Sequence, residues 1–150
     1  MTQNTLVWMH ENEYNENELN IQGSYGNTAL MKASREGKYE IVQELLNAKA
    51  DITLKNVDGN TALWLACFSE NSAIVETLIN AGIEIDTQNV NGVTPLMYAA
   101  SSGKENMVKM LLEAGADVSI KNPDDFTALD LAASAKILKM LRLAQKNKTA

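Results

Sequence analysis

Short apolar blocks alternate with polar segments along most of this chain. Three successive stretches carry apolar residues at positions i, i+1, i+4 and i+5: YEIVQELL (39–46), SAIVETLI (72–79) and ENMVKMLL (105–112). This spacing places the apolar side chains on one face of an α-helix. A block rich in alanine and leucine precedes each stretch, so the pattern predicts successive pairs of short helices.

The blocks share one register, which repeats every 33 residues. Each unit begins its first helix after a threonine, with leucine two residues later and alanine five residues later; the threonines are Thr28, Thr61, Thr94 and Thr127. A threonine hydroxyl there can accept a hydrogen bond from the first helical turn. The predicted first helices are about 29–36, 62–69, 95–102 and 128–134, and the second helices about 39–48, 72–80, 105–113 and 136–145.

Glycines mark where second helices end. Gly82 and Gly115 occupy one column of the repeat, just after the second helix, where a left-handed residue commonly ends a helix. The first unit has Lys49 in that column. A lysine in that conformation is strained. Polar segments rich in glycine and asparagine follow, and they predict extended, hairpin-like loops.

The repeated blocks resemble a known family. GNTALMKAS, GNTALWLAC, GVTPLMYAA and FTALDLAA are similar to the ankyrin signature T-P-L-H-x-A, and the period of 33 residues matches. The resemblance covers about residues 18–145. It implies an all-α ankyrin-repeat solenoid of stacked helix–turn–helix units with β-hairpin loops and a concave binding face. The expected repeat domain is 18–146, with repeats at about 26–58, 59–91, 92–124 and 125–146, followed by a tail at 147–150.

Three departures from the family pattern are visible. The signature histidine is replaced in all four units, by Met31, Trp64, Met97 and Asp130. Asp125 stands where the other loops have glycine. The fourth unit is about three residues shorter between its helices, which predicts a terminal capping repeat. Ile137, Leu138 and Leu141 are expected to cover the apolar side of the third unit.

Residues 1–17 precede the first loop and contain one apolar cluster, Leu6-Val7-Trp8-Met9, among acidic and asparagine residues. Two interpretations stay open: a cover over the exposed end of the first unit, or a disordered tail with one apolar patch.

Charge and composition argue against nucleic-acid binding, a membrane span and a secretory signal. The formal charge is −6, from 13 basic and 19 acidic side chains, and nucleic-acid binders usually carry a basic surface. No apolar run approaches the roughly 18 residues that span a bilayer, and the N-terminus resembles no secretory signal. Cys67 is the single cysteine, so no intrachain disulfide can form, and a cytoplasmic location is expected.

Candidate catalytic groups are sparse. His10 and Cys67 are the only histidine and cysteine, and no cluster has metal-ligand spacing. Carboxylates such as Asp58, Asp124 and Asp125 fall at loop tips, where solvated turn residues are usual. We therefore expect no enzymatic activity, no cofactor and no metal.

The remaining expectation is a protein-interaction module that is monomeric when unbound: an adaptor, an assembly factor or a regulatory factor. Its alternative is a regulatory domain that acts on an enzyme or a larger complex. Positions three and seven after each threonine share a helix face. In the four units these pairs are Met31 and Arg35, Trp64 and Phe68, Met97 and Ser101, and Asp130 and Ser134, of which the first three are the candidates for partner binding. Trp64 is either exposed or enclosed between units. The loop tips add Tyr25, Asn27, Val57, Asp58, Asn60, Asn91, Val93, Asp124 and Phe126.

One further face is basic. Lys139, Arg142 and Lys146 line up on the last helix. They form either a surface for an acidic partner or, as is more usual, a solvated outer face.

Overall fold

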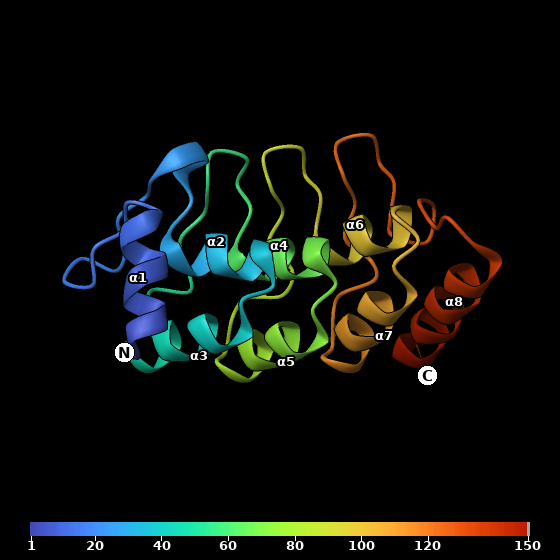
Figure 1. The fold of residues 1–150 in the computed structure, drawn as a ribbon. Helices are drawn as coiled ribbons and strands as arrows, with labels where there is room; N and C mark the ends of the chain where they lie inside the picture. The colour runs from blue at the N-terminus through green and yellow to red at the C-terminus, as the bar shows by residue number, and fades with distance from the viewer. Residues whose placement is uncertain (150) are drawn as a thin grey trace. The chain divides into compact units, whose positions relative to one another are not determined.

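A computed structural model describes residues 1–149, and every regular element within them is a helix (Figure 1). The elements in chain order are α1 (Gln3–Glu11), the short 3₁₀ helix η1 (Ser24–Gly26), α2 (Ala29–Glu36), α3 (Tyr39–Asn47), α4 (Ala62–Ser69), α5 (Ser72–Asn80), α6 (Pro95–Ser101), α7 (Glu105–Glu113) and α8 (Ala135–Thr149). The chain divides into two compact units, Met1–Ile83 and Glu84–Ala150.

The first unit contains two of the expected helix pairs. Within it, α2 packs against α4 and α3 against α5, so that first helices and second helices form two rows (Figure 1). Leu30 and Leu63 from the first helices and Val42 and Ile74 from the second are buried between the rows. The prediction of paired helices in this part of the chain is confirmed, with each bound within one residue.

The threonine caps form as expected at Thr28 and Thr94, whereas the cap expected at Thr61 is wrong, because its side chain forms no cap hydrogen bond. The Thr28 hydroxyl accepts a hydrogen bond from the Met31 backbone N–H at 3.2 Å in the first unit. In the second unit the Thr94 hydroxyl accepts one from Met97 at 3.1 Å, and Pro95 follows it in the first turn. A missing N–H costs nothing at that position.

The loops are tight turns, and the expected β-hairpins are wrong because residues 1–149 contain no strand. In the loop at 56–60 the Asn56 backbone N–H donates to the Asn60 carbonyl at 3.0 Å. The Asn56 side-chain oxygen accepts from the backbone N–H groups of Asp58 and Asn60, each at 3.0 Å. The loop satisfies these amides locally, which leaves few for a strand ladder. Asn89 and Asn122 close the loops of the second unit in the same way.

The fourth unit departs most from expectation. Residues 128–131 form one turn, so the first helix expected at 128–134 is wrong. The reason is the short spacing: the Ser134 hydroxyl already caps α8 by accepting from Ile137 N–H at 3.1 Å. The Ala133 N–H donates instead to the carbonyl of Ala100 on α6, at 3.0 Å.

The last helix is longer than expected. It runs to Thr149, so residues 147–149 of the expected tail are helical, while Ala150 lies outside the described residues. Ile137 and Leu141 are buried, Leu138 is half-buried, and α8 packs against α7. None of the helices in residues 1–149 combines the length and the apolar character that crossing a bilayer requires.

Residues 1–17 are attached to the first helix pair through α1. Met9 is fully buried. The hydroxyls of Thr2 and Thr5 donate to the Glu44 carboxylate on α3, the first at 3.0 Å. At the other end of α1, the Trp8 indole N–H donates to Glu36 on α2 at 3.0 Å.

Candidate functional site

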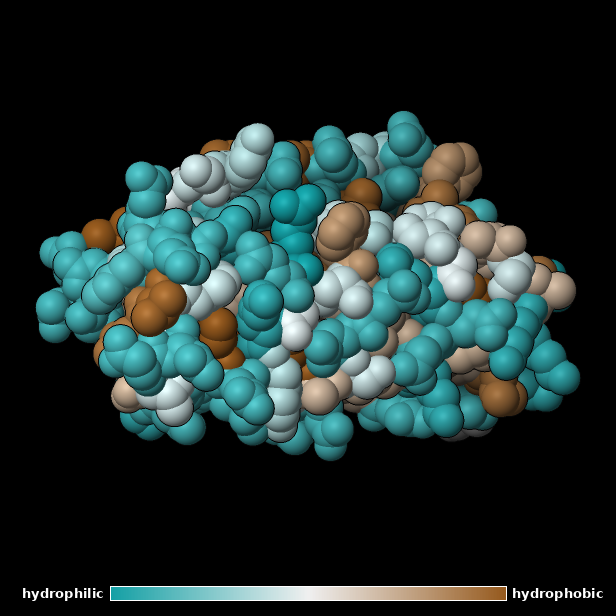
Figure 2. All heavy atoms as spheres, viewed as in Figure 1, coloured by the Kyte–Doolittle hydropathy of each residue, from teal (hydrophilic) through white to brown (hydrophobic). Residues whose placement is uncertain are grey.

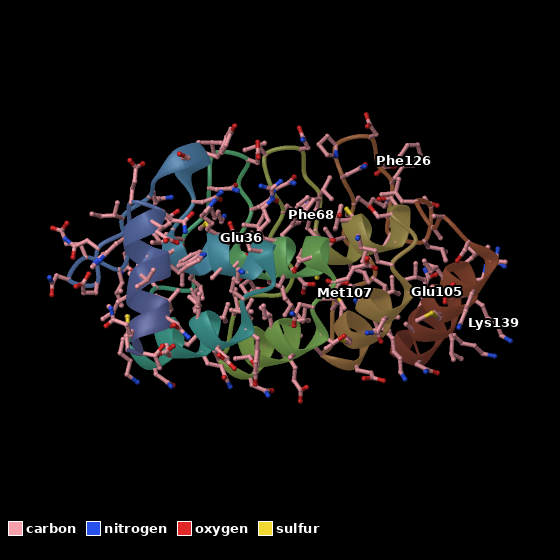
Figure 3. All side chains as sticks on the ribbon, in the orientation of Figure 1. Glu36, Phe68, Glu105, Met107, Phe126 and Lys139 are labelled. Atoms are coloured by element: carbon pink, nitrogen blue, oxygen red, sulfur yellow. The ribbon has the colours of Figure 1, made fainter. Side chains whose placement is uncertain are left out.

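The site begins with two aromatic residues one helical turn apart on α4. Leu63, Ala66 and Cys67 are buried on the core side of this short helix. Phe68 therefore points outward with 44% of its surface exposed (Figure 3), and Trp64 is half-buried. The two rings are stacked, with centroids 6.4 Å apart and planes 9° from parallel. This half-buried position answers the question that the sequence leaves open for Trp64.

A basic side chain from the neighbouring helix joins this pair. Arg35 stands in the last turn of α2, one repeat before Phe68, and its guanidinium carbon lies 5.2 Å from the centre of the Phe68 ring. Guanidinium groups are attracted to the faces of aromatic rings. The contact gives Trp64, Phe68 and Arg35 one fixed arrangement on the surface of the first unit.

A cavity of ≈ 390 Å³ opens beside these three residues. The loop tips form its other wall, with Tyr25 75% exposed and Asp58 exposed. Its polar lining includes the nearly buried side chains of Asn27 and Asn60. We call this cavity, with Tyr25, Arg35, Asp58, Trp64 and Phe68 on its walls, the aromatic groove.

Hydrogen bonds between the two loops keep the walls of the aromatic groove in place. The Asn56 amide donates to the Asn27 side-chain oxygen at 3.0 Å, and the Val57 N–H donates to the Tyr25 carbonyl at 3.0 Å. The Gln22 amide bridges the loops by donating to the carbonyls of Gly26 and Lys55 at 2.9 and 2.7 Å. Sequence reasoning missed Gln22 and Asn56, although Asn56 recurs at the repeat interval as Asn89 and Asn122.

Tyr25 adds a backbone feature. Its φ is 58°, in the left-handed region that residues other than glycine rarely adopt. Strained backbone of this kind gathers at functional sites, where the surrounding structure holds it. Its side chain stays exposed while its carbonyl fixes the next loop.

The prediction that Met31 and Met97 lie on the surface is wrong. Met31 and Met97 are each only 1% exposed and belong to the core. Both lie in the first helical turn, next to the threonine cap, and that turn is buried in each case. Residues four positions later, Arg35 and Ser101, are exposed.

The other expected residues separate between the two units. In the first unit Val57 is exposed at its loop tip and lies outside the lining of the aromatic groove. Six candidates belong to the second unit: Asn91, Val93, Met97, Ser101, Asp124 and Phe126. Among these Phe126 is an exposed aromatic residue on its loop (Figure 3), and Val93 is half-buried.

The second unit has a larger hollow of ≈ 840 Å³ beside α7 and α8. Met140 and Leu143 line it, and Leu143 is 58% exposed. Met140 and Leu143 are three residues apart on α8 and therefore share a helix face. This spacing could have predicted an apolar surface there, but the sequence analysis did not use it. Lys148 crosses this region to Asp117, with 2.7 Å between ammonium and carboxylate. That bond, together with those from Ser119, holds the pKa of Asp117 well below its usual range.

The acidic side chains and the single histidine are spread over the described surface. Residues 1–149 hold no group of three His, Cys, Asp or Glu side chains placed to bind a metal ion. The exposed His10 side chain lies 2.8 Å from Glu16. Figure 2 shows mostly hydrophilic side chains on the viewed face, with the apolar ones in small groups.

Comparison with protein families gives a match that extends over nearly the whole chain. A family model described as ankyrin repeats (3 copies) matches the chain twice, over residues 3–89 and 83–150. A search of curated proteins finds no match.

Proposed function

This chain belongs to the ankyrin-repeat family, and we propose that it binds a partner protein through the aromatic groove of its first unit. Ankyrin repeats are in general protein–protein interaction modules, and repeat arrays bind through surfaces that their stacked units present. In this role the chain acts as an adaptor, an assembly factor or a regulatory factor in the cytoplasm, and not as an enzyme.

The observation that carries the proposal is the exposed, stacked Phe68. Tryptophan, tyrosine and arginine are the residues that most often dominate binding energy at interfaces, and all three types line the aromatic groove with Phe68. A ring that already contacts both Trp64 and Arg35 loses little conformational entropy when a partner covers it.

The loops support the same surface. Binding residues are disproportionately found on loops that a rigid scaffold positions. Here the tips that carry Tyr25 and Asp58 are fixed to one another by backbone and side-chain hydrogen bonds. A partner would therefore meet a groove whose shape is set before binding, which lowers the cost of association.

The test is a pair of matched variants. Proteins that the wild type captures from its native host are identified, and the affinity of each is then measured against Phe68→Ala and Arg142→Ala. Phe68→Ala should weaken binding of the partner more than about tenfold, which is the loss of a typical aromatic anchor. Arg142→Ala, an exposed change on α8 in the second unit, should leave the affinity nearly unchanged.

Circular dichroism of both variants must match the wild type. If Arg142 matters and Phe68 does not, the groove is not the binding surface, and the basic face of α8 becomes the better candidate.

A further inference from the structure

We infer that the partner segment in the aromatic groove carries a single carboxylate beside an apolar or aromatic side chain, and that Arg35 binds this carboxylate. The inference rests on the proposed function and names the chemistry of the partner at the same site.

Arg35 is already oriented for such a ligand. The guanidinium carbon of Arg35 lies over the Phe68 ring, 5.2 Å from its centre. Within residues 1–149 the Arg35 side chain forms none of the ion pairs, and its contact is the ring. A planar guanidinium offers paired N–H donors that match the two oxygens of a carboxylate. The planar fork of a guanidinium is pre-organised, so less entropy is lost for each hydrogen bond that forms.

The apolar part of the ligand follows from the aromatic walls. Phe68 is exposed beside Arg35, and Tyr25 is the most exposed of the three aromatic residues on the groove. A side chain that follows or precedes the carboxylate would cover Phe68 and exclude water from the Arg35 contact. A charge-assisted hydrogen bond is stronger when water is excluded.

Neighbouring charges limit the ligand to one negative group. Asp58 lies on the same groove. A second cavity of ≈ 500 Å³ also borders Arg35. Glu11, Glu13 and Glu36 line it together with Lys32, which pairs with Glu36 at 3.2 Å and leaves the acidic side chains in excess. These carboxylates would repel a polyacidic segment and would favour basic residues that flank the single carboxylate. A phosphate, with close to two negative charges, suits this surface less than a carboxylate does.

The test uses an immobilised array of short peptides and the full chain carrying a fluorescent label. Each peptide holds one glutamate beside Phe, Trp, Leu or Met, with neutral or lysine-containing flanks. Each is printed beside a glutamine twin and a phosphoserine twin. The best glutamate peptides are then titrated in solution. We expect them to bind more than about tenfold tighter than their glutamine twins, and tighter than the phosphoserine twins.

Variants assign this preference to Arg35. Arg35→Met keeps much of the side-chain stem over Phe68 and removes the charge, so it should abolish the difference between glutamate and glutamine. Arg35→Lys keeps the charge without the planar fork and should retain only part of the difference. Arg142→Ala removes one positive charge in the second unit and should change nothing.

The outcomes separate this inference from the proposed function. If glutamate and glutamine peptides bind equally, and Phe68→Ala weakens both, the carboxylate inference is overturned while the groove remains a binding surface. Tighter binding of the phosphoserine twins would also overturn it. If no peptide binds, or if Phe68→Ala has no effect, both the inference and the proposed groove are rejected.

Discussion

Lys49 is the residue at which a single substitution should stabilise this protein. It follows α3 with φ at 70°, a left-handed conformation in which its Cβ crowds the following carbonyl oxygen. The equivalent positions after α5 and α7 are Gly82 and Gly115, with φ at 88° and 91°. The perturbation is therefore Lys49→Gly, which gives the first unit the residue that the other two already have.

The local hydrogen bonds show that the three positions are equivalent. The Lys49 N–H donates to the Leu46 carbonyl at 3.0 Å, as Gly82 does to Ile79 and Gly115 to Leu112. Glycine at position 49 can therefore keep the same backbone bond. A Cβ placed on Gly82 or Gly115 would have no neighbour within 4 Å. Glycine and lysine at these equivalent positions therefore differ in the cost of the left-handed backbone and not in contacts with neighbouring atoms.

The expected gain is the balance of two opposing effects. A left-handed residue other than glycine costs about 1–2 kcal/mol. Glycine gives back about 0.4–1 kcal/mol, because it adds conformational freedom to the unfolded chain. We expect Lys49→Gly to raise the free energy of unfolding by about 0.5–1 kcal/mol. With a urea slope near 2 kcal/mol/M, the midpoint should rise by about 0.25–0.5 M.

The assay is urea denaturation followed by circular dichroism, with Lys49→Ala as the matched control. Alanine removes the same charge but keeps the Cβ in the left-handed conformation, so this variant should gain nothing. The reverse change, Gly115→Lys, should lower the midpoint by a similar amount. Equal gains for Lys49→Gly and Lys49→Ala would show that charge, and not φ, is responsible; no gain for Lys49→Gly would refute the strain argument.

Two further predictions concern α8. Truncation after Ala135 removes Ile137 and Leu141, which are buried, so the shortened chain should aggregate or melt at a lower temperature; a well-behaved monomer with an unchanged Tm would show that α8 is not a cap. The second concerns Asp117, whose pKa is lowered by Lys148 and Ser119. A carboxyl whose pKa is lowered by folding stabilises the fold fully above the unfolded value of about 3.9; this stabilisation declines below that pH and is lost as the pH falls through the lower pKa of the folded state. Lys148→Met should therefore lower the urea midpoint at pH 7, and the difference from the wild type should shrink steadily as the pH falls below about 4; a difference that stays constant from pH 7 down through this range would contradict the assignment.

The helix pairs could be predicted from the sequence because several columns repeat together. Each threonine, leucine and alanine column specifies a cap, a core contact and a close helix approach, and all three indicate the same helix bounds. The fourth unit keeps the columns of Thr127, Leu129 and Ala132, yet no first helix forms there. These three residues favour a first helix, but the short distance in sequence to Ser134, which caps α8, leaves no room for it.

The candidate site could be predicted only in part, because periodicity identifies residues on one helix face without giving their depth. Met31 and Arg35 share a face, but the first is buried and the second exposed. The i, i+4 spacing therefore correctly predicted Phe68 and Arg35 as surface residues, and it wrongly predicted Met31 as one. What it could not supply was the contact of Arg35 with Phe68, which depends on how α2 and α4 pack.

Packing between neighbouring loops explains why aspartate can replace glycine at position 125. Gly26 and Gly92 have φ at 74° and 75°, and Asp125 occupies the equivalent position of the last loop with φ at 69°. A Cβ on Gly92 would lie 2.4 Å from the Pro123 side chain of the next loop, and one on Gly26 would lie 3.0 Å from the Val57 nitrogen. Glycine is thus required at these positions for two reasons: its backbone has a positive φ, and the next loop approaches too closely for a Cβ. Asp125 is exposed, so only the first requirement applies, and aspartate tolerates a left-handed φ better than most residues.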